Sequence, residues 1–489
     1  MNEDGTPAVV EDSYMSIPFS EAEIAAEERR PKRKVAVMVG YSGTGYHGLQ
    51  INHKEKTIEG DIFAALVAAK AISKANADDP RKSSFVRCAR TDKGVHAAGN
   101  MISLKLIIED PDVVKNINEA LPPQIRVWGI VRTNNAFSCY QACDARWYEY
   151  LMPSYCLLPP HPESFLGKKV LESIKEKGAE YEYAERLGEV KDYWAEVEEN
   201  DIKPILESLE PEVREAVIQR IHSAEKDEAA QEGSTRQEPT GVVPDQEKPE
   251  VVEESEDANM QDPENAAPEG STVAADMASA APEEPEPVDA TGTKEERNAK
   301  LFPVDAALRR IKAAYVAAKR RYRVSPERIA QLQRALDQYV GTRNYHNYTI
   351  HKTFRDPSAK RLIKSFVVES EPIQINDTQW LSLKVHGQSF MMHQIRKMVG
   401  LAVMATRCGA TAPEALIPET YGPARISIPR APGLGLLLER PVFDSYNRRA
   451  VDNLNLETLD YAKYETEIRK FKDEFIYRHI FELEEKENS

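Results

Sequence analysis

The chain has 489 residues, of which 41% are hydrophobic and 29% charged, and its formal net charge is −16. It contains no run of about eighteen apolar residues, which argues against a membrane-spanning helix, and its acidic N-terminus resembles neither a secretory signal nor an Arg-rich transit peptide. Its five cysteines are odd in number and lack Cys-x-x-Cys spacing, so we expect a soluble protein of a reducing compartment, with neither a disulfide framework nor a zinc ribbon.

The negative charge is concentrated in two segments. Residues 225–289 hold 20 acidic and 3 basic side chains, and residues 1–28 hold eight acidic side chains and no basic one. The rest of the chain therefore carries a net charge of about +9. With that net charge, the remainder of the protein can carry a basic surface. The acidity of the whole chain therefore does not exclude a nucleic-acid partner.

The chain begins with an acidic arm, residues 1–31, which we expect to be disordered. A basic cluster, residues 29–34, then precedes the first predicted strand. Such a cluster fits a nuclear-import signal, an RNA-contacting arm or a solvated entry to the strand, and the sequence leaves these three interpretations open.

The first predicted strand, residues 35–41, leads into Gly-Thr-Gly-Tyr-His-Gly at 43–48, which fits the dinucleotide-binding pattern G-x-G-x-x-G. The context argues against that use. In a dinucleotide site the helix opens at the third glycine, whereas residues 49–56 are polar and loop-like, and the next helix is predicted to begin after Thr57 as its N-cap. We therefore expect no nucleotide cofactor.

A charged loop, residues 90–97, lies between two alternating apolar stretches, a pattern typical of two strands joined through a polar turn. The loop presents a carboxylate, Asp92, between Arg90 and Lys93. These cations would keep Asp92 ionised at neutral pH, which suits a nucleophile or a base better than a proton donor. The alternative is structural, because aspartates often cap a tight turn before a glycine.

Residues 144–150 alternate as a strand and include Tyr148. A lone tyrosine in a strand is more often a half-buried packing residue than a catalytic one. Residues 157–224 are predicted to form a charged helical insertion. Residues 225–298 are poor in aromatic side chains and rich in Glu, Pro and Ala, which predicts a disordered acidic insertion.

After the insertion, a helix is predicted to begin at Ser325-Pro326, with the serine as cap. Residues 341–349 contain Arg343 and several aromatic and amide side chains, which would contact RNA bases or else fill a turn. Residues 390–400 predict another helix. Its core stripe is predicted to include Met392, and Arg396 lies on a neighbouring face, where a buried arginine would need an anionic partner.

A series of segments, taken in order from residue 35 to 446, resembles the signatures of the TruA family of RNA pseudouridine synthases, and of its eukaryotic branch in particular. They are the strand and loop at 40–50, the Arg-Thr-Asp-Lys-Gly-Val-His-Ala loop at 90–97, the strand at 144–150, the segment at 341–349, the helix at 390–400 and the closing strand at 431–438. The resemblance implies an α+β fold. Two ferredoxin-like halves would share a mostly antiparallel sheet, with helices on one side and a basic RNA-binding cleft between the halves.

The expected organisation has six parts. They are an acidic arm at 1–31, the N-terminal half of the synthase domain at 32–156, a charged helical insertion at 157–224, a disordered acidic insertion at 225–298, the C-terminal half of the synthase domain at 299–450, and a charged helical extension at 451–489.

The resemblance also implies the reaction, which is isomerisation of uridine to pseudouridine in tRNA. This chemistry breaks the glycosidic bond, turns the uracil and rejoins it to the ribose through carbon, so it needs no redox cofactor, nucleotide or added water. By resemblance, Asp92 attacks or deprotonates the sugar or the base, and Arg396 pairs with Asp92. Tyr148 would stack on the uracil and assist removal of the carbon-bound proton.

The resemblance further implies substrate contacts. Arg90 would fill the space left by the extruded uridine. A leucine of the closing strand, aligned best with Leu436, would line the uracil pocket. Lys93 and Arg343 are candidate contacts to phosphate.

The implied partner is tRNA, around its anticodon stem and loop, with small nuclear RNA and messenger RNA as additional targets, and we expect a nuclear monomer. Fungal relatives have been described as zinc-binding, so a zinc ion stays open although no zinc motif is present. Two other classes of protein are alternatives. They are an RNA-binding protein without catalysis, disfavoured because Asp92, Tyr148 and Arg396 are all present, and a zinc hydrolase or deaminase, disfavoured because its motifs do not occur.

Overall fold

The structure is a computed structural model that describes residues 19–52, 54–221 and 294–487. The chain divides into two units, Met1–Leu209 with Leu308–Ser489, and Glu210–Ala307. No helix among the described residues is both long and apolar enough to cross a membrane. The central sheet and the residues of the candidate site belong to the first and larger unit.

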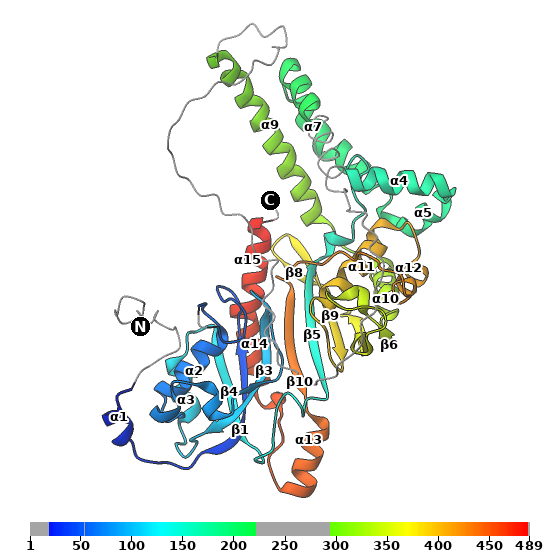
Figure 1. Ribbon diagram of the computed structural model, residues 1–489. Coiled ribbons are helices and arrows are strands. Elements are labelled where there is room, and N and C mark those ends of the chain that lie inside the picture. The colour runs from blue at the N-terminus through cyan, green and yellow to red at the C-terminus, as the bar shows by residue number, and fades with distance from the viewer. Residues whose placement is uncertain (1–18, 53, 222–293, 488–489) are drawn as a thin grey trace, which may run out of the picture. The chain divides into compact units, whose positions relative to one another are not determined.

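One ten-stranded sheet forms the centre of the larger unit (Figure 1). Its main path runs β4-β1-β3-β10-β5-β9-β7-β6, with β2 added to β3 and β8 added to β9. The strands are β1 Arg33–Tyr41, β2 Val86–Arg87, β3 His96–Leu106, β4 Ile125–Arg132, β5 Ala145–Pro153, β6 Gly341–Asn344, β7 Lys360–Val368, β8 Ile373–Ile375, β9 Thr378–Gly387 and β10 Leu436–Val442.

Strands β4, β1 and β3 form one block of the sheet and β5, β9, β7 and β6 form the other, with β10 between them. Strand β5, from the N-terminal half of the chain, therefore pairs with β9 of the C-terminal half. On one edge β10 pairs in parallel with β3, where Leu437 lies opposite His96, and on the other it pairs antiparallel with β5. The other pairings among the described strands are antiparallel. This arrangement confirms the predicted α+β fold with a mostly antiparallel sheet.

Helices pack around the sheet, and two of the predicted starts are confirmed. Thr57 Oγ1 accepts a hydrogen bond from Gly60 N (3.2 Å) at the start of α2, and Ser325 Oγ accepts one from Arg328 N (3.1 Å) at the start of α10, as N-caps do. The longer helices are α2 Ile58–Ala68, α3 Val113–Ala120, α4 Phe165–Lys177, α5 Glu180–Leu187, α9 Lys294–Arg321, α10 Pro326–Asp337, α11 Gln394–Cys408 and α15 Arg478–Glu487.

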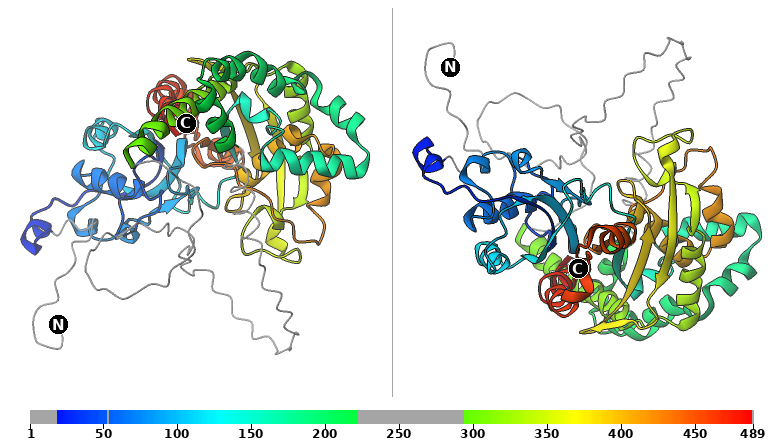
Figure 2. Two further views of the ribbon diagram at one scale, coloured as in Figure 1. Left: turned by 90° about the horizontal axis from the view of Figure 1, so that it is seen from above. Right: turned by 90° about the horizontal axis from the view of Figure 1, so that it is seen from below.

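Helical segments cover both faces of the sheet, which corrects the expectation of helices on one side. Successive residues of a strand point to opposite faces. On β5, Tyr148 faces the loop that carries Asp92, whereas Glu149 contacts Lys472 of the C-terminal segment. Figure 2 shows this C-terminal segment in red between the blue N-terminal strands and the yellow strands of the second half.

The C-terminal segment is therefore an integral layer of the fold. It comprises α13 Asp444–Arg449, η9 Tyr461–Tyr464, α14 Glu465–Phe471, η10 Lys472–Tyr477 and α15, joined by short connections. Phe471, Ile476 and Ile480 are buried in one core with Leu151 and Leu437.

The predicted arm and insertions have mixed outcomes. Residues 21–25 of the arm form a short helix, α1 (Glu21–Ala25), which begins with a capping box of Ser20 and Glu23. The charged insertion is helical from α4 to α7 (Lys203–Glu207), with 41% of Leu171 exposed. Most of the predicted acidic insertion, residues 225–293, lies outside the described residues.

Candidate active site

The loop between β2 and β3 carries Asp92 at its tip. Val95 N donates a hydrogen bond to Asp92 O (3.1 Å), which closes a tight turn, and Gly94 adopts φ +74° within it, a backbone angle that glycine tolerates best. The carboxylate is free to meet a ligand, because 47% of the Asp92 side chain is exposed.

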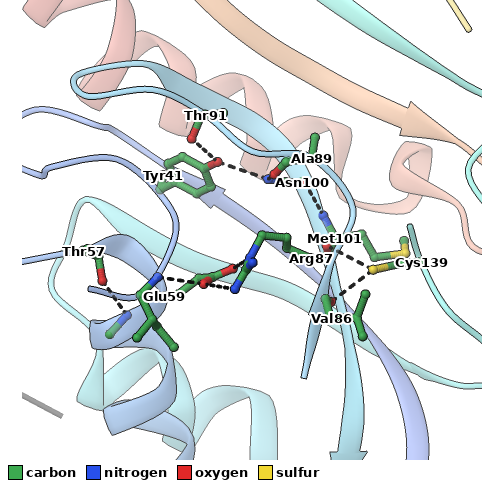
Figure 3. A network of polar contacts seen from close by, with 12 residues as sticks. Tyr41, Thr57, Glu59, Val86, Arg87, Ala89, Thr91, Asn100, Met101 and Cys139 are labelled. Carbon is green, nitrogen blue, oxygen red and sulfur yellow. Dashed lines mark hydrogen bonds and ion pairs between the residues drawn. The ribbon is translucent and has the colours of Figure 1, made fainter. Parts of the chain in front are cut away.

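A buried hydrogen-bond network holds the loop from below (Figure 3). Tyr41 Oη lies 2.9 Å from Thr91 Oγ1 and accepts a hydrogen bond from Asn100 Nδ2 (3.1 Å). Asn100 Nδ2 also donates to Ala89 O (3.0 Å). Because Tyr41 and Asn100 are fully buried on β1 and β3, the residues on either side of Arg90 are fixed to the sheet rather than to solvent.

A buried ion pair fixes the start of the same loop. Glu59, in the first turn of α2, is fully buried and pairs with Arg87 of β2, whose Nη2 lies 2.8 Å from Glu59 Oε2 (Figure 3). Ile51 N donates a further hydrogen bond to Glu59 (3.0 Å). Glu59 therefore joins the glycine-rich segment, α2 and the Asp92 loop into one rigid group.

The glycines at 43–48 pack against the Asp92 loop. A Cβ on Gly43 would lie 2.3 Å from Val95 O, and one on Gly48 would lie 3.0 Å from Thr91 O. Gly48 also has φ +97°, and Leu49 N donates to Thr91 O (3.2 Å). The glycines thus permit close approach of two loops, and α2 begins only at Ile58, in agreement with the rejection of a dinucleotide site.

Tyr148 lies beside this loop, on the face of β5 that Asp92 occupies. Its side chain is 8% exposed, and its ring meets that of Phe390 edge to face at 5.2 Å between centroids. Burial raises the pKa of the Tyr148 hydroxyl to about 12, with Asp92 as a smaller contributor. The hydroxyl therefore stays protonated at neutral pH and presents a ring and a hydrogen-bond donor together.

Arg396 lies on α11, near Asp92 but not paired with it. Its Nε donates to Ala431 O (2.7 Å), and its guanidinium lies beside Gly433. Burial and the nearby Arg430 lower the pKa of Arg396, while Tyr150 and Asp92 act in the opposite direction. Within the described part of the chain, no ion pair of 4.0 Å or less joins Arg396 to Asp92, so the predicted contact is absent in this conformation because the guanidinium is bound to the 431–433 segment.

Among the described residues, the basic side chain that comes within 4.0 Å of the Asp92 carboxylate is His393. His393 Nδ1 lies 3.8 Å from Asp92 Oδ2, and His393 is the N-cap of α11 with a left-handed backbone, φ +62°. The N-cap residue of α11, at the end where the helix dipole is positive, therefore lies close to the carboxylate.

The predicted substrate-contact residues take different positions. Arg90, Lys93 and Arg343 are exposed, as contacts to RNA would need to be. Leu436 is 9% exposed. In the pairing of β10 with β5, Leu436 lies opposite Tyr150 and Leu438 lies opposite Tyr148. Both leucines share the face of Tyr148, and Leu438 is the nearer of the two in strand register.

Two sequence interpretations are decided by burial. Tyr345, Asn347 and Tyr348 are at most 1% exposed, so these three side chains of 341–349 fill a core rather than contact bases. Met392 is 48% exposed, so its predicted place in a core stripe is wrong, because α11 begins two residues later at Gln394.

The zinc alternative gains no support here, since the residues that the structure describes contain no group of three or more His, Cys, Asp and Glu side chains able to hold a metal ion.

Three residues of the site were missed by the sequence interpretation. Arg146 donates to Cys88 O (2.9 Å) and Gln388 O (3.2 Å) and so ties the start of the Asp92 loop to the C-terminal half. Phe390 supports the ring of Tyr148, and His393 approaches Asp92. All three lie in segments that resemble family signatures, but their contacts arise from pairing between strands far apart in the sequence.

Comparison with known proteins gives the family. A family model described as tRNA pseudouridine synthase matches residues 335–444. The chain is 42% identical to tRNA pseudouridine synthase 1 of Yarrowia lipolytica, over 94% of this chain and 72% of the relative, and 39% identical to that of Schizosaccharomyces pombe, over 94% and 82%. It is 34% identical to tRNA pseudouridine(27/28) synthase of Saccharomyces cerevisiae, over 84% and 85%. With an exposed aspartate on an anchored loop, a buried tyrosine beside it and this similarity over nearly its whole length, the chain belongs to the family of tRNA pseudouridine synthases.

Proposed function

We propose that this protein isomerises uridine to pseudouridine in tRNA with Asp92 as the catalytic carboxylate. The observation that carries the proposal is the placement of Asp92. It is a half-exposed carboxylate on a loop held from below by buried Tyr41, Asn100 and Glu59. A fixed carboxylate that faces solvent is suited to covalent or base chemistry on a bound nucleotide.

Each remaining residue of the site has a role in this proposal. Tyr148 stacks on the detached uracil and assists removal of the carbon-bound proton at the end of the reaction. Because its hydroxyl is protonated at neutral pH, it acts by hydrogen bonding rather than as a phenolate. Arg396 is close enough to add a favourable electrostatic interaction with Asp92 once substrate excludes water.

The substrate must leave its base stack to reach Asp92. Arg90, exposed two residues before Asp92, would occupy the vacated space. Lys93 and Arg343 would contact phosphate from the two halves of the protein, and Leu436 would line the uracil pocket. The reaction rearranges one nucleotide without oxidation or reduction, so it needs no cofactor.

The wider assignments rest on the resemblance of the sequence motifs. We propose that the uridines lie in the anticodon stem and loop of tRNA, with small nuclear RNA and messenger RNA as further targets. The basic cluster at 29–34 supports a nuclear location, and the protein is proposed to act as a monomer.

The test is tritium release from tRNA labelled at uridine C5, the carbon that becomes glycosidic. Asp92→Asn keeps the size of the side chain and removes its charge, so the rate should fall by about 10³-fold or more, with unchanged unfolding. Asp112→Asn, at the exposed start of α3, is the matched control and should leave the rate unchanged. Equal release by the wild type and Asp92→Asn would reject the catalytic role, and RNA binding without release by either would favour a binding protein.

A further inference from the structure

His393 occupies an unusual position in the candidate active site. It is a non-glycine residue with φ +62° and ψ −1°, a left-handed conformation that few such residues adopt. The turn around it is closed by hydrogen bonds from Met391 N to Gln394 Oε1 (2.9 Å) and from Gln394 N to Met391 O (3.1 Å). A third, from Thr349 Oγ1 to Met392 O (2.9 Å), anchors the turn to the 341–349 segment. Local strain that is held this firmly is often found at functional sites.

The two ring nitrogens of His393 have different neighbours. Arg430 Nη1 lies 2.9 Å from Nε2, and Asp92 Oδ2 lies 3.8 Å from Nδ1. The His393 side chain is only 10% exposed, whereas that of Asp92 is 47% exposed. The ring is therefore largely buried and lies between the Arg430 guanidinium and the carboxylate of Asp92.

The contact with Arg430 decides which nitrogen carries hydrogen. A guanidinium has donors and no acceptor, so Nε2 must accept and must be bare. The single hydrogen of the neutral ring is then on Nδ1, which faces Asp92. A ring with hydrogen on both nitrogens would have no acceptor for the Arg430 N–H, so it does not fit the 2.9 Å contact.

We propose that His393, as its neutral Nδ1–H tautomer fixed by Arg430, is a positioning residue that orients the Asp92 carboxylate. The proposal rests on the catalytic role of Asp92 given above. The present Nδ1 to Oδ2 distance is longer than a hydrogen bond, and catalytic hydrogen bonds commonly shorten when substrate binds. His393 thereby supplies the direct contact to Asp92, and Arg396 acts on the carboxylate from farther away.

The first experiment separates this role from a structural one. His393→Gly removes the ring and tolerates the left-handed backbone, and His393→Asn also tolerates it while its amide N–H replaces Nδ1–H. We expect kcat for tritium release to fall about 10- to 100-fold in His393→Gly, with KM for tRNA nearly unchanged. His393→Asn should recover kcat to within about threefold of the wild type.

The matched control is His351→Gly, since His351 also has a positive φ (+56°) and is exposed. It should leave kcat unchanged. Unchanged kcat in His393→Gly, or equal loss in His393→Gly and His393→Asn, would overturn the proposal. A fall in Tm of both variants without a change in kcat per folded molecule would also overturn it and assign His393 a purely structural role.

A second experiment needs no activity. The ¹⁵N and proton signals of the His393 ring, measured by NMR on the free full-length protein, should show hydrogen on Nδ1 and a bare Nε2, and Asp92→Asn should shift Nδ1. Hydrogen on Nε2, or a ring insensitive to Asp92→Asn, would overturn the proposal. If the wild type released no tritium, the proposed function would fail, whereas the tautomer would still report on the contact between Arg430, His393 and Asp92.

Discussion

Neighbouring residues on the two faces of strand β5 differ in how completely their polar groups are hydrogen-bonded. On one face, Tyr148 and the half-exposed Asp92 leave polar groups available, and the nearest ion pair of Asp92 is at 3.8 Å. On the other face, Glu149 is 2% exposed and fully bound. It accepts hydrogen bonds from Tyr477 Oη (2.6 Å), Lys472 Nζ (3.1 Å) and Ser382 Oγ.

The difference shows how one strand serves both catalysis and stability. Lys472 also pairs with Glu439 of β10, so the bound face joins two central strands to the C-terminal segment. A buried, satisfied network resists movement, which allows the opposite face to keep unsatisfied groups in place for a substrate. Changes on the bound face should therefore affect stability, and changes on the open face should affect catalysis.

The largest effect on stability is expected from Lys472→Met. The variant leaves the buried Glu149 and the largely buried Glu439 without their cation, and breaking such a group costs about 3–5 kcal/mol. Urea unfolding should show this loss, while tritium release per folded molecule stays near that of the wild type. Lys463→Met provides the matched control, because Lys463 pairs with Glu457 on the surface of the same segment and its loss should cost under about 1 kcal/mol. A similar cost for both variants would remove the distinction between the faces.

A pair of tyrosines tests the comparison by removing one hydroxyl from each face. Tyr148→Phe keeps the ring and loses the group proposed to assist proton removal, so kcat should fall about 10²-fold with little change in unfolding. Tyr477→Phe loses the hydrogen bond to Glu149, so the free energy of unfolding should fall by about 1.5–3 kcal/mol, with kcat unchanged. The comparison would be broken if either variant changed both quantities to a similar extent.

Much of the open face could be predicted from the sequence, because its determinants are local. The turn around Asp92, the cap at Thr57 and the helix start at Ser325 depend on neighbouring residues, and all three are present. The positions of Tyr148 on a strand and of Arg396 on a helix also follow from local periodicity. The catalytic roles of these residues stay predictions.

The rest depended on contacts that a sequence pattern does not show. The left-handed turn at His393 is held by Thr349, 44 residues earlier in the chain, so neither the exposure of Met392 nor the approach of His393 to Asp92 could be foreseen. Within 341–349, the buried Tyr348 places its Oη 2.6 Å from Thr420 Oγ1, a contact with a residue 72 positions later in the chain. The C-terminal segment is predicted as an extension, whereas in the structure its Lys472 pairs with the buried Glu149 and the largely buried Glu439, and its apolar side chains enter the core.

The smallest expected effect is a pH dependence from the same network. Burial raises the pKa of Glu439 to about 7 from its usual 4.5. Burial would also raise that of Glu149, but Lys472 and hydrogen bonds outweigh it and hold the pKa near 2. Between about pH 4.5 and 7 the native protein therefore binds a proton that the unfolded chain has released, so the free energy of unfolding decreases as pH rises through this range. The pair shares this proton, whichever carboxylate holds it.

Glu439→Gln removes this titration and so tests its sign. The free energy of unfolding of the variant should equal that of the wild type near pH 5, where Glu439 is protonated. At pH 8 it should be about 1–2 kcal/mol larger than that of the wild type. Urea unfolding across this pH range measures both. Glu457→Gln, on the exposed pair with Lys463, should show no such trend. If the difference in free energy of unfolding between Glu439→Gln and the wild type stayed constant with pH, or if the wild type were the more stable at pH 8, Lys472 would keep both carboxylates ionised. The bound face would then be a fully charged triad, and its contribution to stability would not weaken toward neutral pH.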